Sequence, residues 1–474
     1  MSARVRRIIL SLAGPVLFLL CYLFLPVSVF ETKQACAAVG TVVWMALWWI
    51  TGVVDFAVTA FLPIAINALF QITDMSAVIS NYASETILLL LGASILTSSW
   101  EETGLDRRIA ARFLSFVGND VKNQIIFWFV LCAALSAILP NAVVCATMTP
   151  IAYSMLQYVG QGDIKNSKFG SLLLLTIAYA TGVGGLASPL GGAMNLVSVD
   201  YLTQVSGQEY MYIQWVIRYL PIMAVLLISN TLVLLHICKK CETISLPKSY
   251  FKEQYEKMPK MTKVEKMSLA LFLAATVLSF CRQFYQSYLP GLKPAYVFII
   301  CGILSFFITH EGGKPLMTWK NTQRRIVWDL MYVFAGGLAL GTLISKSGVA
   351  QTLGDAVSKM SFSSDFVLIL VIMTFTVLLS DITSNTATAA VALPIVISIA
   401  EGFGKNPIPY IYIATIGVNL SYMLPTSIRA IPVGYGLEPK YMLKKGIPIT
   451  VMVIVLMSVL SYVMLRFWPA FSTT

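Results

Sequence analysis

The stretch "SDITSNTATAAVALPIV", residues 380–396, decides the fold because it places polar groups inside an apolar region of the chain. Its first seven residues include two Ser, two Thr, an Asp and an Asn. Such groups are costly in hydrocarbon unless they are paired or line a wet or ligand-filled cavity. The stretch therefore indicates an interrupted helix at membrane depth that faces a binding site.

The composition around this stretch is that of a membrane protein. Of the 474 residues, 57% are hydrophobic and 12% are charged, whereas about 25% of the residues of a typical soluble domain are charged. Apolar runs of roughly 20 residues, the length of a bilayer-spanning helix, recur along the chain. These runs are continuous rather than alternating, so the sequence predicts an all-α polytopic membrane protein and not a β-barrel.

The apolar runs predict about eleven transmembrane helices. They are 8–27, 36–54, 56–72, 85–103, 169–181 continued by 195–205, 213–237, 267–289, 294–309, 328–346, 408–420 continued by about 430–440, and 447–468. Two further apolar stretches, 125–158 and 365–401, are too long for one helix and carry Pro, Asn and hydroxyl residues at their centres. We interpret them as re-entrant hairpins, which enter and leave the membrane on the same side.

The net charge of +11 follows the membrane topology, so we expect no nucleic-acid partner. The basic residues concentrate in loops that lie inside if the N-terminus does: Arg107, Arg108, Arg112, Lys165, Lys168, the loop 238–266, Lys314, Lys320, Arg324, Arg325, Lys440, Lys444 and Lys445. Cytoplasmic loops are enriched in Lys and Arg. We therefore expect a multi-pass protein of the cell (inner or plasma) membrane, with a cytoplasmic N-terminus and an outside C-terminus.

The two halves of the chain repeat each other. Four pairs of matching residues share an offset of 244 positions: Gly92 and Gly336, Gly104 and Gly348, Asn141 and Asn385, and Pro150 and Pro394. Five complete predicted spans separate the starts of the two copies, and an odd number of crossings reverses orientation. Inverted repeats with broken helices are the architecture of secondary transporters, which hold substrate near the midplane.

This repeat predicts a division of the chain into five parts. They are N-terminal scaffold helices at 1–84, a first repeat at 85–237, a cytoplasmic Lys-rich loop at 238–266, scaffold helices at 267–327, and a second repeat at 328–474. The first repeat contains a cytoplasmic-side hairpin at 125–158 and a broken helix at 169–205. The second repeat contains an outside hairpin at 365–401 and a broken helix at 408–440.

The centre of the second hairpin carries the chemistry of a binding site. The hydroxyls of Ser384 and Thr386 can donate to a carboxylate or ligate a cation, and the amide of Asn385 can do both. Backbone N–H groups at the start of the following helix favour an anion. Exposed carbonyl oxygens of a broken helix favour a cation.

The run "SNTATAA…LP" from Ser384 resembles the signature of the divalent anion:sodium symporter family, which includes the INDY-like and CitT-like di- and tricarboxylate carriers. The resemblance covers nearly the whole chain: paired Gly segments, two hairpins, and a Gly-rich break after each hairpin, the first being "GVGGLASPLGGAMN" (182–195). It implies a homodimer with a scaffold domain and a transport domain that moves like an elevator. It also implies substrate held between the hairpin tips, with sodium sites beside them.

Three places depart from the family pattern. Pro140-Asn141-Ala142 stands where the family has Ser-Asn-Thr, and "GGAMN" (191–195) replaces its Gly-Thr-Pro-Pro-Asn run. The second break, "MLPTSIRAIPVGYG" (423–436), lacks Pro-Pro-Asn and carries Arg429. Arg429 could grip a substrate carboxylate, replace a lost sodium ion, pair with Asp381, or reach the cytoplasmic surface by snorkelling. Asp381 could be a proton or cation site or a structural carboxylate.

The resemblance gives a set of candidate site residues. Candidate substrate-binding residues are Asn141, Ala142, Ser188, Gly191, Ser384, Asn385, Thr386, Thr426, Ser427 and Arg429. Candidate sodium ligands are Asn141, Gly191, Asp381 and Asn385. We expect no cofactor other than Na⁺.

The leading interpretation is a secondary transporter of small divalent organic anions, C4 or C5 dicarboxylates, in the lipid bilayer. Loss of the first-tip hydroxyls removes oxygen ligands for a hard cation and favours dicarboxylate exchange, while sodium symport stays open. An enzyme is disfavoured because the candidate titratable groups are almost only Asp381 and Arg429. A channel is disfavoured because no continuous selectivity-filter motif is visible.

Overall fold

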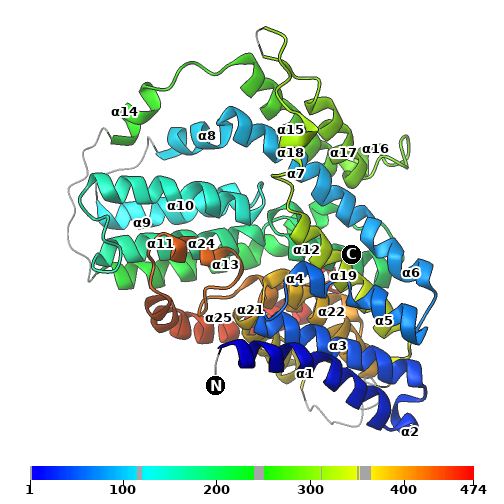
Figure 1. The fold of residues 1–474 in the computed structure, drawn as a ribbon. Helices are drawn as coiled ribbons and strands as arrows, with labels where there is room; N and C mark the ends of the chain where they lie inside the picture. The colour runs from blue at the N-terminus through cyan, green and yellow to red at the C-terminus, as the bar shows by residue number, and fades with distance from the viewer. Residues whose placement is uncertain (1–2, 115–119, 240–249, 311, 350–351, 353–363) are drawn as a thin grey trace.

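The computed structural model describes residues 3–114, 120–239, 250–310, 312–349, 352 and 364–474, and the regular elements in these ranges are all helical. The longer helices are α1 (Ala3–Phe24), α3 (Lys33–Thr51), α5 (Leu62–Phe70), α7 (Glu85–Thr103), α8 (Leu105–Leu114), α9 (Val121–Ser136), α10 (Asn141–Tyr158), α11 (Lys168–Gly185), α12 (Ala193–Ser206), α13 (Tyr212–Cys238), α15 (Lys263–Phe280), α17 (Pro294–Ser305), α19 (Trp328–Lys346), α21 (Asp365–Ile382), α22 (Asn385–Gly402), α23 (Pro407–Asn419) and α25 (Pro439–Phe467). Figure 1 shows them as one helical body.

Short helices connect or interrupt the long ones. They are α2 (Val27–Phe30), α4 (Phe56–Thr59), α6 (Met75–Ile79), α14 (Tyr250–Glu256), α16 (Arg282–Tyr285), α18 (Trp319–Thr322), α24 (Ala430–Gly434), and the 3₁₀ turns η1 (Ser80–Ala83), η2 (Pro189–Gly191), η3 (Ser427–Arg429) and η4 (Pro469–Ser472). Three of them, η2, η3 and α24, interrupt apolar helices at the places where the sequence predicts breaks.

The helices have the length and composition of membrane spans. Eight helical segments of the described chain are long and apolar enough to cross a bilayer: Arg4–Phe24, Lys33–Thr51, Met75–Thr103, Tyr212–Cys238, Trp328–Lys346, Asp365–Ile382, Asn385–Gly402 and Pro439–Phe467. Shorter apolar helices cover Phe56–Phe70, Val121–Ser136 and Pro294–Ser305. The prediction of an all-α polytopic membrane protein is confirmed.

The helix boundaries carry the sequence repeat. Shifted by 244 positions, the bounds of α10 become 385–402, which are the bounds of α22. The same shift moves the first residue of α9 to position 365, where α21 begins. The chain therefore folds into the same helix–turn–helix unit twice, although few residues of the two copies are identical.

Three predicted spans differ from the observed helices. The span predicted at 267–289 ends early, because α15 stops at Phe280 and the short helix α16 follows it. The span predicted at 56–72 is two helices, α4 and α5, because Pro63 starts a new helix and supplies no N–H to continue the old one. The half-helix predicted at 430–440 is shorter, since α24 ends at Gly434 and α25 already begins at Pro439. Gly436, with a φ of 103°, makes the turn between them, a conformation that favours glycine.

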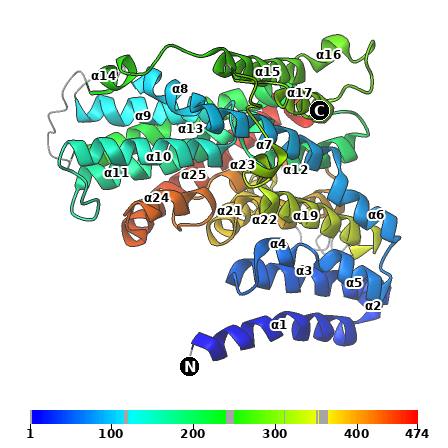
Figure 2. The ribbon, with the colours of Figure 1, turned by 45° about the horizontal axis from the view of Figure 1, so that its top comes forward.

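The long helices pack in several groups. Helix α7 lies against α15 and α17, and α1 lies against α3 at the opposite edge of the molecule, as Figure 2 shows. Helix α11 packs on α9, α10 and α13, while α23 packs on α12, α21 and α22. Backbones approach closely where glycine permits it: a Cβ on Gly184 would lie 2.2 Å from the Ala133 carbonyl oxygen.

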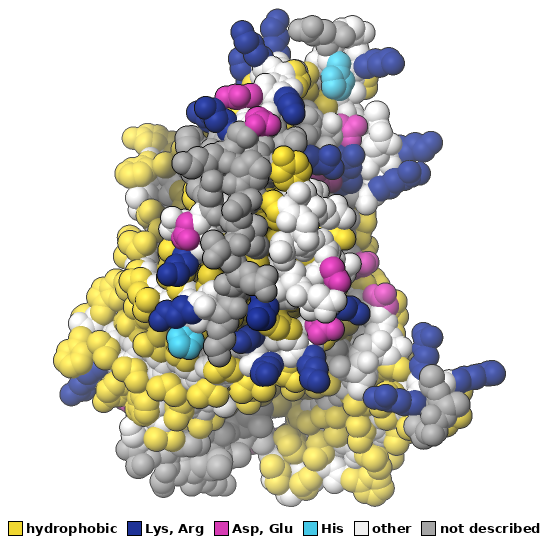
Figure 3. Space-filling model, turned by 90° about the vertical axis from the view of Figure 1, so that its left-hand side faces the viewer, with side chains coloured by type: hydrophobic (Ala, Val, Ile, Leu, Met, Phe, Trp, Pro, Cys, Tyr) yellow, Lys and Arg dark blue, Asp and Glu magenta, His cyan; other side chains and the backbone are white. Residues whose placement is uncertain are grey.

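Basic side chains gather on one face of the molecule. Figure 3, which views the left-hand side of Figure 1, shows many Lys and Arg side chains there and a broad hydrophobic region beside them. The loop that joins α10 to α11 and the short helix α14 lie on this side. Residues 240–249 of the Lys-rich loop predicted at 238–266 lie outside the described residues.

Candidate functional site

Each hairpin turns over in a few residues. The first tip, which we define as residues 137–142, joins α9 to α10, and Pro140 precedes the first helical residue Asn141 without a side-chain cap. The second tip, residues 383–386, joins α21 to α22, and the Ser384 hydroxyl accepts a hydrogen bond from the Ala387 N–H at 3.1 Å. Ser384 thus serves as a helix cap, a role for which Ser is among the preferred residues.

The first break, residues 186–192, lies beside the first tip. A Cβ on Gly191 would lie 2.5 Å from the carbonyl oxygens of both Gly185 and Ser136. A Cβ on Gly185 would lie 3.3 Å from the Asn141 amide nitrogen. Backbone carbonyl oxygens from α9 and from the two sides of the break therefore converge next to the Asn141 side chain. Ser188 caps η2 at the edge of this cluster, and its hydroxyl accepts a hydrogen bond from the Gly191 N–H at 3.1 Å.

The second break, residues 420–429, is held by the end of α21. The Asp381 Oδ1 atom accepts hydrogen bonds from the backbone N–H groups of Tyr422 and Met423, both at 2.8 Å. These N–H groups lie in unwound chain and have no helical partner, so the carboxylate satisfies them. The Thr426 hydroxyl donates to the Asp381 carbonyl oxygen at 3.3 Å. Asp381 is fully buried, and its Oδ2 atom has no hydrogen-bond partner within the described chain.

Three buried asparagines join the first break to the second tip. Asn195 donates to the carbonyl oxygens of Gly185 at 2.7 Å and Ser188 at 2.8 Å. Asn419 donates to the Asn195 Oδ1 atom at 2.8 Å. Asn385 in turn donates to the Asn419 carbonyl oxygen at 3.5 Å. The network connects the two broken helices directly and brings the second tip to their junction.

Arg429 lies at this junction and is 1% exposed. Its Nη1 atom is 3.5 Å from the Asn385 Oδ1 atom, which also accepts from the Ser421 hydroxyl at 3.2 Å. A Cβ on Gly182 would lie 3.0 Å from the Arg429 Nη2 atom, so the guanidinium rests against the backbone of α11. The Arg429 Nε atom is buried without a partner in the described structure. The site therefore holds a guanidinium with unused donor capacity.

Two of the four roles considered for Arg429 do not fit this geometry. Within the described residues no carboxylate oxygen lies within 4.0 Å of its guanidinium, so it forms no ion pair with Asp381. Its burial is also incompatible with snorkelling to the surface. Gripping a substrate carboxylate and replacing a sodium ion both fit a buried cation beside Asn385.

The remaining candidate residues from the sequence lie on the two tips and in the second break. Ala142 lies on the first tip and Thr386 is buried on the second. Ser427 belongs to the same break as Arg429, but it is exposed and has a φ of 54°. The sequence did not single out Asn195, Asn419 or Ser421. The sequence signal that could have found them is an amide or hydroxyl residue at the edge of each helix break.

A cavity of about 110 Å³ reaches the first tip. It is lined by Pro140, Asn141 and Ala142, by Ala193 after the first break, and by one face of α7. None of the second-tip residues lines it. We call it the tip cavity; it gives the first tip an open approach.

A larger vestibule of about 650 Å³ adjoins the tip cavity. It runs along the outer face of α10 past Ala146 and Pro150 and ends near Arg107. Glu101 and Arg325 line both the vestibule and the tip cavity. The two residues therefore mark the neck through which the tip cavity is reached.

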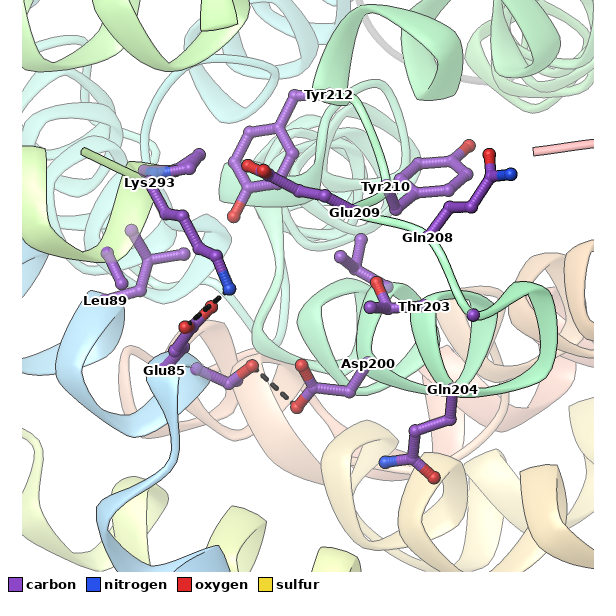
Figure 4. Close-up of a pocket in the computed structure, with 15 residues that line it drawn as sticks. Glu85, Leu89, Asp200, Thr203, Gln204, Gln208, Glu209, Tyr210, Tyr212 and Lys293 are labelled. Atoms are coloured by element: carbon purple, nitrogen blue, oxygen red, sulfur yellow. Dashed lines mark hydrogen bonds and ion pairs between the residues drawn. The ribbon is translucent and has the colours of Figure 1, made fainter. Parts of the chain in front are cut away.

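A further pocket of about 430 Å³ lies at the other end of α7 and is shown in Figure 4. Glu85 pairs with Lys293 there at 2.8 Å, and the Thr86 hydroxyl donates to Asp200 at 2.6 Å. Leu89 lines both this outer pocket and the tip cavity. One face of α7 thus passes from the outer pocket through the tip cavity to the vestibule.

Apolar spanning helices, a duplicated helix–turn–helix unit, and two broken helices whose polar ends meet in the interior together define a polytopic membrane carrier. Residues 46–417 match the citrate transporter family, CitMHS. Because the match covers well over half of the chain, the protein belongs to this family. The resemblance to di- and tricarboxylate carriers is thereby confirmed.

Curated relatives and one solved structure agree with this assignment. The chain is 28% identical to the sodium-dependent dicarboxylate transporter SdcS of Staphylococcus saprophyticus, over 97% of this chain and 92% of the relative. It is 29% identical to SdcS of Staphylococcus aureus strain NCTC 8325, over 95% and 90%. The crystal structure of the Alcanivorax borkumensis YdaH transporter resembles it with a TM-score of 0.54 at 12% identity, over 83% of this chain and 88% of that one, which supports the fold alone.

Proposed function

We propose that this protein is a secondary active transporter of C4 or C5 dicarboxylates. The observation that carries the proposal is the buried guanidinium of Arg429 at the junction of both broken helices, whose Nε donor has no partner and which has no carboxylate within 4.0 Å in the described chain. A planar guanidinium matches a carboxylate bidentately. The names of the SdcS relatives support a dicarboxylate as the ligand.

The coupling we propose is exchange of one dicarboxylate for another. A buried cation is costly inside a membrane protein, and no carboxylate of the described residues lies within 4.0 Å of Arg429, so a carrier that moves empty carries this charge without a bound anion beside it. A bound dianion supplies that counter-charge. The loaded carrier then crosses more easily than the empty one, which is the condition for obligatory exchange.

Sodium symport is the second candidate, and a specific observation favours it. The carbonyl oxygens of Ser136, Gly185 and Gly191 lie together beside Asn141, and oxygen atoms are the ligands of a hard cation. Both SdcS relatives are named sodium-dependent. If the protein is a sodium symporter, Na⁺ binds at the first tip, and the charge of Arg429 takes the place of a second sodium ion at the second tip.

The transport cycle that we propose is a rigid-body movement of the repeats against the scaffold helices. The five-part division at 1–84, 85–237, 238–266, 267–327 and 328–474, with repeats inverted in the membrane, supports it. We further propose a homodimer in the cell membrane, with the N-terminus and the basic loops inside and the C-terminus outside. These proposals rest on the loop charges and on the family resemblance.

Uptake of labelled succinate into proteoliposomes tests the function. The four conditions are with and without a sodium gradient, each with and without unlabelled dicarboxylate inside. Uptake that needs internal dicarboxylate and ignores sodium supports exchange. Sodium-driven uptake into empty vesicles supports symport, and absence of uptake under all four conditions contradicts both.

A further inference from the structure

Arg325 is a charged side chain in the substrate's route that the second-tip site does not use. It lies in the segment between α18 and α19 and lines both the vestibule and the tip cavity. Its side chain is 35% exposed, so water in the vestibule reaches it. A solute that moves from the vestibule to Asn141 must pass it.

One end of the Arg325 guanidinium is firmly anchored. Its Nη1 atom is 2.5 Å from a Glu102 carboxylate oxygen and 3.2 Å from the Ser98 carbonyl oxygen. Glu102 lines neither cavity. These two contacts hold the Arg325 side chain in place at the neck, on the side that faces away from the cavities.

The other edge of the guanidinium is loosely held. The Nε atom is 3.7 Å from a Glu101 oxygen, which is too long for a hydrogen bond. No hydrogen bond of the Nη2 atom is found within the described chain. Glu101 is 44% exposed and can move away into the vestibule at small cost.

We propose that Arg325 is a carboxylate-binding entry residue, where a substrate carboxylate replaces Glu101 before it reaches the first tip. This entry role rests on the proposed dicarboxylate transport and adds a second substrate-binding site to the one at Arg429. The Nε and Nη2 donors form the fork that binds a carboxylate bidentately. Glu101 acts as a competing internal carboxylate that occupies the fork when no substrate is present.

This role predicts opposite effects of two substitutions. Arg325→Gln removes the fork, so the KM for dicarboxylate on the vestibule side should rise about tenfold, the loss expected for a half-exposed charged hydrogen bond. Glu101→Gln removes the competitor, so the KM on that side should fall. A purely structural ion pair predicts a different pattern, in which both substitutions impair transport.

The measurement compares right-side-out and inside-out membrane vesicles that contain the full-length protein. Labelling of Ser154→Cys, which lines the vestibule, with an impermeant maleimide identifies the vestibule side. Arg324→Gln is the matched control because Arg324 is exposed and lines neither cavity. Its KM should equal that of the wild type on both sides.

The expected result is a rise for Arg325→Gln, a fall for Glu101→Gln, and no change of KM on the opposite side. Shifts in the same direction, or equal shifts on both sides, overturn the entry role while leaving dicarboxylate transport intact. A wild type that carries no dicarboxylate overturns the proposed function, and this proposal with it.

Discussion

The two hairpin tips occupy equivalent places in the chain but differ in chemistry. Asn141 and Asn385 each begin the second helix of their hairpin. The first tip is neutral, lies among backbone carbonyl oxygens and borders an open cavity. The second tip lies against the guanidinium of Arg429 and lines none of that cavity. Duplication preserved the backbone, and the two copies then acquired different partners for the same asparagine.

The largest expected effect comes from removing the charge at the second tip. Arg429→Ala leaves Asn385 without this donor and the site without its cation, so we expect transport to fall at least roughly a hundredfold. Initial rates of dicarboxylate uptake at equal protein amounts measure it. Arg429→Lys keeps the charge but not the fork and should retain part of the activity. Full activity of Arg429→Ala would remove the distinction between the tips.

The first break, which lies beside the first tip, should be sensitive to volume rather than charge. Gly191→Ala puts a Cβ 2.5 Å from two carbonyl oxygens, so we expect a loss of activity of about tenfold or more and a lower Tm. Gly434→Ala is the matched control, because a Cβ there meets nothing within 4 Å. Uptake and thermal unfolding of the two variants in detergent check the prediction. Equal behaviour of both variants would contradict close packing at the first break.

The asparagine network that joins the first break to the second tip gives a third prediction. Asn195→Ala removes two hydrogen bonds to carbonyl oxygens of the first break and the acceptor for Asn419. Each buried group left unpaired costs about 1–3 kcal/mol, so the Tm should fall and uptake should weaken by about tenfold. Asn123→Ala, at an exposed position of α9, is the control and should change neither.

The smallest effect is expected when the first tip is made to resemble the second. Pro140→Ser combined with Ala142→Thr restores two hydroxyls beside Asn141, which adds oxygen ligands for a cation. We expect uptake to remain within about threefold of wild type while its dependence on sodium increases. The dependence of the initial rate on sodium concentration checks this. An unchanged sodium dependence would show that the hydroxyls are not what separates the tips.

Much of this arrangement could be predicted from residue patterns. The hairpin centres were visible because Asn, Pro and hydroxyl residues interrupt apolar runs, and the repeat was visible because its offset is constant. The roles of Asn195 and Asn419 could not be predicted, since a buried amide acquires its meaning from partners that are distant in sequence. For the same reason the sequence left four roles open for Arg429: pairing with Asp381, binding substrate, replacing a sodium ion and snorkelling.

The close approach of Gly184 to the Ala133 backbone has a mechanical consequence. With a separation that leaves no room for a side chain, α9 and α11 cannot slide past each other without a clash of main chains. The first hairpin and the first broken helix must then travel together as one piece. Under the proposed transport cycle, opening and closing of the route to Asn141 is then left to the boundary between α7 and the first tip, which line the tip cavity together.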